Sequence, residues 1–306
     1  MTKVLVIGGP TASGKSGLAV GLAVALNGVI INGDSMQVYD GLPLLAAQPE
    51  ASDLATAPHK LYRSLAPNQP CSAARWRDMA LAEIAAAESA GQLPIIVGGT
   101  GFYLKTLMKG ISPIPDIPQS VRDALNAQLA EIGNKAFHAL LAAKDPVMAA
   151  KLAPGNSQRL VRAMEVLTHT GKSLAAWQEG APVGTPAHLD FLFVTLLPPR
   201  ERLYAQCNKR FDLMIDAGAL DEAATFTAQY PYETAAEVPL KKALGYPEIA
   251  AYQRGEMTLE EAKTKATQST RHYAKRQMTW FRNQLKADMV LETSDPQPVI
   301  DTLQKG

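Results

Sequence analysis

Short apolar runs alternate with helical patterns along the first third of the chain. Residues 4–7, 29–31 and 93–97 are continuous apolar stretches of strand length. Between the first two, apolar residues recur at helical spacing over residues 18–26, and a second amphipathic helix is predicted over residues 76–84. Strands separated by helices form βαβ units, in which the strands run parallel. The pattern therefore predicts a parallel sheet flanked by helices.

The pattern changes in the middle of the chain. A proline-rich stretch at residues 111–118 is followed by helical periodicity without strands, and a second hinge at residues 182–186 precedes a strand over residues 189–197. We therefore expect an all-helical domain inserted into the sheet-bearing core. The expected segments are the first part of the core, the inserted domain and the second part of the core, at residues 1–112, 113–186 and 187–306.

The link between the first strand and the first helix has the spacing Gly-x-x-x-x-Gly-Lys-Ser. Its glycines permit a tight turn with inward N–H groups, Lys15 supplies charge for terminal phosphates, and the Ser16 hydroxyl is placed to hold Mg²⁺. The N-terminus of the following helix also points its positive dipole at an anion. The link therefore predicts a phosphate-binding loop on an α/β, P-loop NTPase-like core. Its residues are Gly9, Pro10, Thr11, Ala12, Ser13, Gly14, Lys15 and Ser16.

A carboxylate follows the second predicted strand. In a parallel sheet, Asp34 lies at the carboxyl edge beside the phosphate loop, where ligands of such sheets bind. An isolated Asp often only caps a turn, but this position favours a functional role. The next strand ends in glycines at residues 98–101, where a nucleotide hydrolase normally has an Asp for the metal. This ending weakens the case for an ordinary ATPase.

Composition further limits the classes of protein to which the chain can belong. The 306 residues are 47% hydrophobic and 19% charged, which suits a folded chain with a large core. A net charge of +1 means that a nucleic-acid partner must be argued from local clusters. Cys71 and Cys207 lie far apart, which argues against a disulfide framework and a cysteine zinc site. Because no apolar run reaches about 18 residues and a strand opens the chain, we expect a cytoplasmic protein without a membrane span.

A helix predicted over residues 259–286 carries the clearest cluster of charge. Residues 263–286 contain seven Lys or Arg and no Asp or Glu. At about 100° per residue, Tyr273 and Trp280 lie on the side expected to anchor the helix to the core. The opposite, outward side suits an RNA backbone, although a merely solvated face is the alternative. This stripe, about 60° wide on the same plot, consists of Arg271, Lys275, Arg282 and Lys286.

Five ordered segments resemble the bacterial tRNA dimethylallyltransferase family. They span nearly the whole chain, which makes the resemblance far more specific than the phosphate loop alone; they are residues 9–16, 34–39, 98–103, 242–246 and 270–282. The resemblance implies transfer of a dimethylallyl group from dimethylallyl diphosphate to N6 of adenosine 37, beside the anticodon of tRNA. The loop would then hold a diphosphate leaving group, and no ATP need be hydrolysed.

The resemblance also implies roles for single residues. Asp34 corresponds to the general base, Arg210 to an arginine that reaches the diphosphate, and Thr11 to a catalytic contact; Lys15 adds charge at the leaving group. The basic stripe is expected to add Arg271, Lys275 and Arg282 to the tRNA contacts. The residues for which the resemblance implies contact with tRNA are Asp34, Ser35, Met36, Gln37, Thr100, Arg122, Gln158, Arg159, Leu160, Val161 and Arg162.

The segment after Tyr39 departs from the family pattern. Residues 42–70 show no clear period and are predicted to form a long loop over the site. Within it, Ala46 and Gln48 stand ahead of Pro49, where the family usually has a hydroxyl residue and a basic residue. Contacts that relatives make at those two places are therefore not implied for this chain.

Other classes fit parts of the sequence. A P-loop small-molecule kinase shares the strand, loop and helix but would transfer phosphate from ATP, and an adenylate isopentenyltransferase would act on a free nucleotide. The long insertion and the basic helix favour a polymer substrate. A non-catalytic RNA-binding module would not need Asp34 at the strand end. We expect a monomeric enzyme that uses Mg²⁺, tRNA and dimethylallyl diphosphate.

Overall fold

The computed structural model describes residues 1–184, 186–231 and 237–305. The chain divides into two compact units. Unit 1 comprises Met1–Met108 and Pro186–Gly306, and unit 2 comprises Lys109–Thr185. Unit 1 contains the sheet, whereas the regular elements lying wholly within unit 2 are helices.

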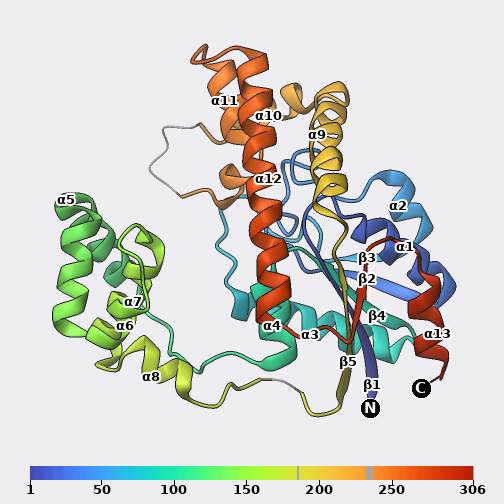
Figure 1. Cartoon of the computed structure of the whole chain (residues 1–306), viewed down its shortest axis with the longest axis horizontal. Coiled ribbons are helices and arrows are strands. Elements are labelled where there is room, and N and C mark those ends of the chain that lie inside the picture. Colours follow the sequence, from blue (N-terminus) through green and yellow to red (C-terminus); the bar gives the residue numbers. More distant parts are fainter. Residues whose placement is uncertain (185, 232–236, 306) are drawn as a thin grey trace. The chain divides into compact units, whose positions relative to one another are not determined.

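Six strands in the described part of the chain form one parallel sheet in unit 1, in the order β3-β2-β4-β1-β5-β6 (Figure 1). Leu5 of the central strand pairs with Ile95 on one side and Leu192 on the other. The central strand is buried on both faces, which explains its continuous apolar sequence. The predicted parallel sheet is confirmed. The strands are Thr2–Gly8 (β1), Gly28–Asn32 (β2), His59–Lys60 (β3), Leu93–Gly98 (β4), Leu189–Leu196 (β5) and Met289–Leu291 (β6).

Helices cover both faces of this sheet. Leu5 and Ile7 of β1 pack against α1 (Lys15–Ala25) and α13 (Gln297–Lys305) on one face. Val4 and Val6 face the opposite way, because successive strand residues alternate. Their side of the sheet is covered by α3 (Ala73–Ser89), by α4 (Gly101–Lys109) and by the end of α12 (Leu259–Gln284).

A second apolar cluster in unit 1 lies around Phe226 and Tyr246. It joins the segment after β2 to a group of helices that includes α12, and Figure 1 shows the long α12 (orange to red) running beside α9 (yellow). This packing fixes α9 and α12 against the core that carries the phosphate loop. The other elements of the group are Arg200–Asp216 (α9), Ala219–Gln229 (α10), Pro239–Lys242 (η1) and Tyr246–Gln253 (α11).

The segment predicted to be a long loop contains regular structure. Ala51–Thr56 form α2, and β3 joins the edge of the sheet. Glu50 and Asp53 form a capping box that starts α2, but α2 has no buried residue. The prediction of a long loop over residues 42–70 is therefore wrong for these two elements, because a short exposed helix leaves no apolar period to detect.

Unit 2 has its own core around Phe137, Leu141 and Met164. Gly133, at φ 75°, interrupts the longest of its helices. The two ends of the unit are joined by antiparallel hydrogen bonds of 3.0 Å between Ile111 and Val183. The predicted insertion of a helical domain into an α/β core is confirmed. Its helices are Gln119–Lys144 (α5), Pro146–Ala150 (α6), Ser157–Thr170 (α7) and Leu174–Glu179 (α8).

Candidate active site

The phosphate loop leaves β1 and enters α1. Gly14 lies at the N-cap of α1 with φ 94°, a left-handed conformation that glycine adopts without steric cost. Ser13 N–H donates to Pro10 O at 3.3 Å, which closes the turn. The Ser13 hydroxyl oxygen is buried and has no hydrogen-bond partner in the described part of the chain. A buried hydroxyl of this kind is available to an anion at the start of α1, where the helix dipole is positive.

Lys15 folds back over this loop. Its Nζ donates to Pro10 O at 3.1 Å. Burial lowers the pKa of Lys15 to about 8, while the nearby Asp34 carboxylate opposes this shift and Arg210 adds to it. These mutual effects place a lysine, an arginine and a carboxylate within electrostatic reach of one another.

Asp34 is held in place by the end of β2. Its N–H donates to Asn32 Oδ1 at 2.8 Å, and Asn32 Nδ2 donates back to Asp34 O at 3.0 Å. Asp34 Oδ1 accepts the N–H of Met36 at 2.9 Å. The other carboxylate oxygen, Oδ2, faces the glycine turn after β4, where a Cβ added to Gly99 would lie 3.2 Å from it. The turn after β2 thus fixes the Asp34 carboxylate and directs its Oδ2 toward the glycine turn after β4.

Arg210 reaches the same place from α9. Its guanidinium donates to Thr11 Oγ1 at 3.3 Å. Burial lowers the pKa of Arg210, and the neighbouring Cys207 and Asp34 oppose that shift. The structure therefore brings together Thr11, Lys15, Asp34 and Arg210, the four residues that the sequence assigned to catalysis, from three segments of unit 1: the phosphate loop, the turn after β2 and α9.

Gln277 is a residue of this site that sequence reasoning missed. It is 6% exposed on the inner face of α12 and bonds both the phosphate loop and the turn after β4, at Thr11 N and Gly99 O. Thr270, Ala274, Gln277 and Phe281 follow one another at helical spacing on the buried face of α12. A polar residue within that apolar spacing is the signal that could have revealed it.

The other core residues expected to contact tRNA surround the turn after β2. Ser35 N–H donates to Thr100 Oγ1 at 2.9 Å, and the Thr100 hydroxyl donates to Ser35 Oγ at 3.1 Å. Gln37 Nε2 donates to Ala46 O and Ala47 O, which fastens the following segment. Met36 is half-buried. Ser35, Met36 and Gln37 therefore follow Asp34 in one turn, and Thr100 is hydrogen-bonded to that turn.

Gln48, one of the two departures from the family pattern, is buried and hydrogen-bonded within the core. It is 7% exposed, and its Nε2 donates to Tyr39 O at 2.6 Å. Its Oε1 accepts Nε of Arg63 at 2.6 Å. The side chain therefore orders the segment that follows Asp34, and it presents no charge to a ligand.

Unit 2 holds its arginines around a buried carboxylate. Glu165 is 1% exposed and accepts hydrogen bonds from Arg122 at 2.9 and 3.1 Å and from Arg162 at 2.5 Å. Burial raises the pKa of Glu165, but the two arginines outweigh it and the pKa is lowered overall. Removing the partners of such a buried charge costs about 3–5 kcal/mol. Both guanidiniums remain partly exposed beside the exposed Arg159.

Two residues of unit 2 lie elsewhere than expected. Leu160 and Val161 are 0% and 6% exposed and belong to the unit's own core. Gln158, by contrast, is exposed. The structure therefore does not support tRNA contact through the side chains of Leu160 and Val161, because hydrophobic packing has removed them from the surface.

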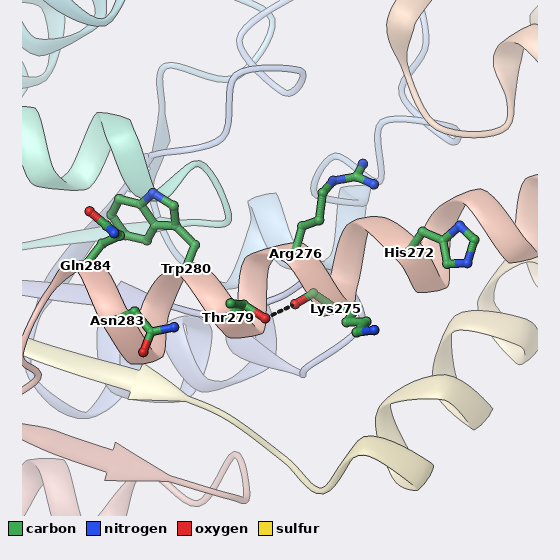
Figure 2. A pocket seen from close by; sticks show the side chains of 7 residues that line it. All are labelled: His272, Lys275, Arg276, Thr279, Trp280, Asn283 and Gln284. Carbon is green, nitrogen blue, oxygen red and sulfur yellow. Dashed lines mark hydrogen bonds between the residues drawn. The ribbon is translucent and has the colours of Figure 1, made fainter. Parts of the chain in front are cut away.

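The outer side of α12 forms a shallow hollow of about 470 Å³. Figure 2 shows its side chains projecting from the single helix. Lys275 lies in it and Arg282 is also exposed, whereas Arg271 is half-buried. Trp280 packs partly against the core but also lines the hollow, so it is more than the inner anchor that the helical plot predicted. The lining residues are His272, Lys275, Arg276, Thr279, Trp280, Asn283 and Gln284.

The fold and this site define a P-loop α/β protein in which a phosphate loop faces a carboxylate, without an acidic residue at the end of β4. The family model described as IPP transferase matches residues 37–284. The chain belongs to this family. Among the residues described, no helix is both long and apolar enough to cross a membrane.

Relatives match over nearly the whole chain. The tRNA dimethylallyltransferase of Paramagnetospirillum magneticum is 54% identical over 302 residues, which cover 99% of this chain and 95% of that protein. The tRNA dimethylallyltransferase of Rhodospirillum centenum is 49% identical over 292 residues, or 95% of this chain and 92% of that protein.

Two solved structures extend the comparison. The tRNA isopentenylpyrophosphate transferase of Bacillus halodurans has a TM-score of 0.68 and 32% identity, covering 100% of this chain and 95% of its own. A eukaryotic dimethylallyltransferase acting on tRNA has a TM-score of 0.84 and 26% identity, covering 100% of this chain and 80% of its own. The similarity therefore includes both sequence and fold.

Proposed function

We propose that the protein transfers a dimethylallyl group from dimethylallyl diphosphate to N6 of adenosine 37 in tRNA. The observation that carries this proposal is the meeting of Asp34 with Thr11, Lys15 and Arg210 at the phosphate loop. Family membership and the names of the relatives support the same substrates. A kinase can also use a carboxylate base, so family membership is what favours prenyl transfer to adenine over phosphate transfer.

Asp34 supplies the base in this proposal. The lone pair of the exocyclic amine is delocalised into the purine ring, which makes N6 a weak nucleophile. As the bond from N6 to the allylic carbon forms, the carbon–oxygen bond to diphosphate breaks and Asp34 accepts the N6 proton. A positioned base contributes about 10²–10⁴-fold to the rate. The hydrogen bond from Met36 N–H occupies Oδ1, so Oδ2 is the oxygen placed to receive this proton.

The phosphate loop, Lys15 and Arg210 stabilise the departing diphosphate. Charge grows on the oxygen that leaves the allylic carbon, and preorganised N–H groups and cations placed there act most strongly where water is excluded. Thr11 presents its hydroxyl beside Arg210 at this point. The partial burial of both cations therefore suits the chemistry, since they keep little hydration of their own.

The residues present fit a Mg²⁺ ion bound together with diphosphate. No group of three or more His, Cys, Asp or Glu that could hold a metal occurs in the part of the chain that the structure describes. Mg²⁺ commonly takes phosphate oxygens and only one or two protein ligands, and the exposed Ser16 at the start of α1 would be one of them. The bound ion would neutralise charge on the leaving group.

Contact with tRNA is proposed for three surfaces. They are the turn around Ser35 and Thr100, the arginines held by Glu165, and the hollow with the basic stripe on α12. Adenosine 37 must leave the stack of the anticodon loop to reach Asp34, which costs a few kcal/mol of stacking. Contacts between basic side chains and the RNA backbone offset that cost.

The test is a direct assay of the product. The enzyme is incubated with dimethylallyl diphosphate, Mg²⁺ and unmodified tRNA, and the RNA is digested to nucleosides for mass spectrometry. We expect isopentenyladenosine, with one diphosphate released per transfer and no consumption of ATP. A product on free adenylate but none on tRNA would overturn the proposed substrate, and phosphate transfer from ATP would overturn the reaction.

A further inference from the structure

Gln277 spans two parts of the site with its side-chain amide. Its Oε1 accepts the N–H of Thr11 at 2.8 Å, and its Nε2 donates to Gly99 O at 2.8 Å. The backbone N–H can only donate and the carbonyl can only accept, so the two bonds together determine the orientation of the amide. The side chain is 6% exposed, which leaves water little access to replace either bond.

The first bond determines what Thr11 can offer to a ligand. Its N–H points to Gln277, while its Oγ1 accepts from the Arg210 guanidinium at 3.3 Å. Thr11 can therefore contact a ligand with its hydroxyl, whereas its N–H is already bound by Gln277. The Thr11 N–H is thus bound by Gln277 on α12, a residue 266 positions further along the chain.

The second bond determines the position of the turn that borders Asp34. A Cβ added to Gly99 would lie 2.4 Å from Gln277 Nε2 and 3.2 Å from Asp34 Oδ2. No side chain fits between the amide and the carboxylate, because contacts below 3.0 Å force atoms to move. Gln277 thus lies across Gly99 from the proposed base.

We propose that Gln277 is a positioning residue for the transfer reaction. It holds the hydroxyl of Thr11 and the turn beside Asp34 at one fixed separation, so that leaving group and base act on the same substrate geometry. The inference rests on the proposed function and extends it to a residue that touches none of the reacting atoms. A misplacement of about 1 Å between such groups lowers a rate by about 10²-fold.

The first experiment compares two replacements of Gln277. Gln277→Met keeps the length and removes both hydrogen bonds, and we expect single-turnover rates at saturating tRNA to fall by about 10-fold to 10²-fold. The affinity for inorganic pyrophosphate, measured by calorimetry without RNA, is expected to change less than about threefold, because the other loop groups and Lys15 remain. If Gln277 had a purely structural role, Gln277→Met would lower the melting temperature, but it would not lower the rate more than the pyrophosphate affinity.

The pH profile gives a sharper readout. The Gln277→Glu variant keeps an acceptor for Thr11 N–H, but its ionised carboxylate cannot donate to Gly99 O. When the carboxyl is protonated, it again offers one donor and one acceptor. The rate of Gln277→Glu relative to the wild type is therefore expected to rise as the pH falls from 8 toward about 5, whereas the relative rate of Gln277→Met stays constant.

Gly99→Ala displaces the same amide from the other side. We expect it to lower the rate, and the double variant Gly99→Ala/Gln277→Met to be no slower than the slower single variant, since both variants disturb the same contact between Gln277 and Gly99. Gln253→Met is the matched control, because Gln253 also donates to a backbone carbonyl, Leu220 O at 2.7 Å, but lies on α11 away from the loop. It should retain the wild-type rate.

Each outcome decides between the hypotheses. Rates for Gln277→Met within about twofold of the wild type, or a relative rate of Gln277→Glu that does not change with pH, would overturn the positioning role. If Gln277→Met does not fold, the pH profile of Gln277→Glu and the rate of Gly99→Ala decide. Failure of the wild type to bind pyrophosphate or to prenylate tRNA would instead overturn the proposed function.

Discussion

Two groups of basic side chains in unit 1 differ in how much water they retain. Lys15 and Arg210 lie against the phosphate loop, where burial lowers the pKa of both. Lys275 and Arg276 project from α12 into solvent (Figure 2), and Arg282 is exposed on the same helix. A cation with little hydration acts strongly on charge that develops beside it, whereas exposed cations act through screened interactions. We therefore expect the cations at the phosphate loop to affect the rate of the reaction and the exposed cations on α12 to affect the affinity for tRNA.

Asp34, the carboxylate near the partly buried cations, should give the largest effect. Asp34→Asn keeps the acceptor for Met36 N–H but removes the base, so we expect turnover to fall by about 10²–10⁴-fold while tRNA affinity stays close to that of the wild type. Single-turnover prenyl transfer and filter binding measure the two quantities. Asp40→Asn, an exposed neighbour, is the control. A normal rate in folded Asp34→Asn would contradict the assignment.

Neutralising the partly buried cations Lys15 and Arg210 should give the second largest effect. Lys15→Met and Arg210→Met remove charge at the departing diphosphate, and we expect each to lower the rate at saturating tRNA by about 10²–10³-fold. Pyrophosphate should also bind more weakly by calorimetry. Arg202→Met, on the exposed side of the same α9, is expected to leave both unchanged. Equal effects of the Arg202 and Arg210 variants would remove the distinction between the two groups.

The pH dependence of pyrophosphate binding tests whether Lys15 differs from the exposed cations. With the pKa of Lys15 lowered to about 8, the free enzyme loses this charge as the pH rises through 8, below the ordinary value of 10.5. An anion binds better to the protonated form, so affinity should fall by up to about tenfold per pH unit above 8, with proton uptake on binding. Calorimetry in buffers of different ionisation enthalpy measures the uptake. Lys15→Met should remove this component of the slope, and a slope equal to that of the wild type would show that another group titrates.

The exposed group should give the smallest effects. Lys275→Gln and Arg282→Gln are each expected to weaken tRNA binding a few-fold, to a similar degree for different tRNAs, and to make the salt slope shallower by about one contact. Turnover at saturating tRNA should stay within about twofold. A salt titration of affinity tests this, with Lys60→Gln, an exposed residue of the edge strand β3, as the control. An unchanged slope would identify the stripe as a solvated face.

Much of the fold and site could be predicted because the signals are local. The phosphate loop, the strand before it and the Asp34 turn each lie within one short segment, and β4 ends in glycines as expected. Their meeting follows from the rule that ligands bind at the carboxyl ends of parallel strands. Arg210, which comes from a helix outside that rule, was placed by resemblance alone.

Contacts between residues that lie far apart in the chain could not be predicted from the sequence. Gln277 meets Thr11 only after the whole of unit 1 has folded, and Glu165 pairs with Arg122 across 43 positions. Leu160 and Val161, by contrast, share one apolar side of α7 with Met164, so helical periodicity indicates their burial, and only the resemblance implied tRNA contact for them. Periodicity shows which face of a helix is apolar, but it does not show which polar residue of that face finds a partner.

The place of unit 2 in the chain has a consequence for synthesis on the ribosome. The central strand β1 needs β5 as a neighbour, and the two are separated by all of Lys109–Thr185. Domains generally fold as units during translation, and the bonds between Ile111 and Val183 close the insertion on itself. Unit 2 can therefore form its core while unit 1 still lacks β5. Until Leu189–Leu196 emerge, the edge of β1 that pairs with β5 stays unpaired, and an unpaired apolar strand edge can pair with another chain.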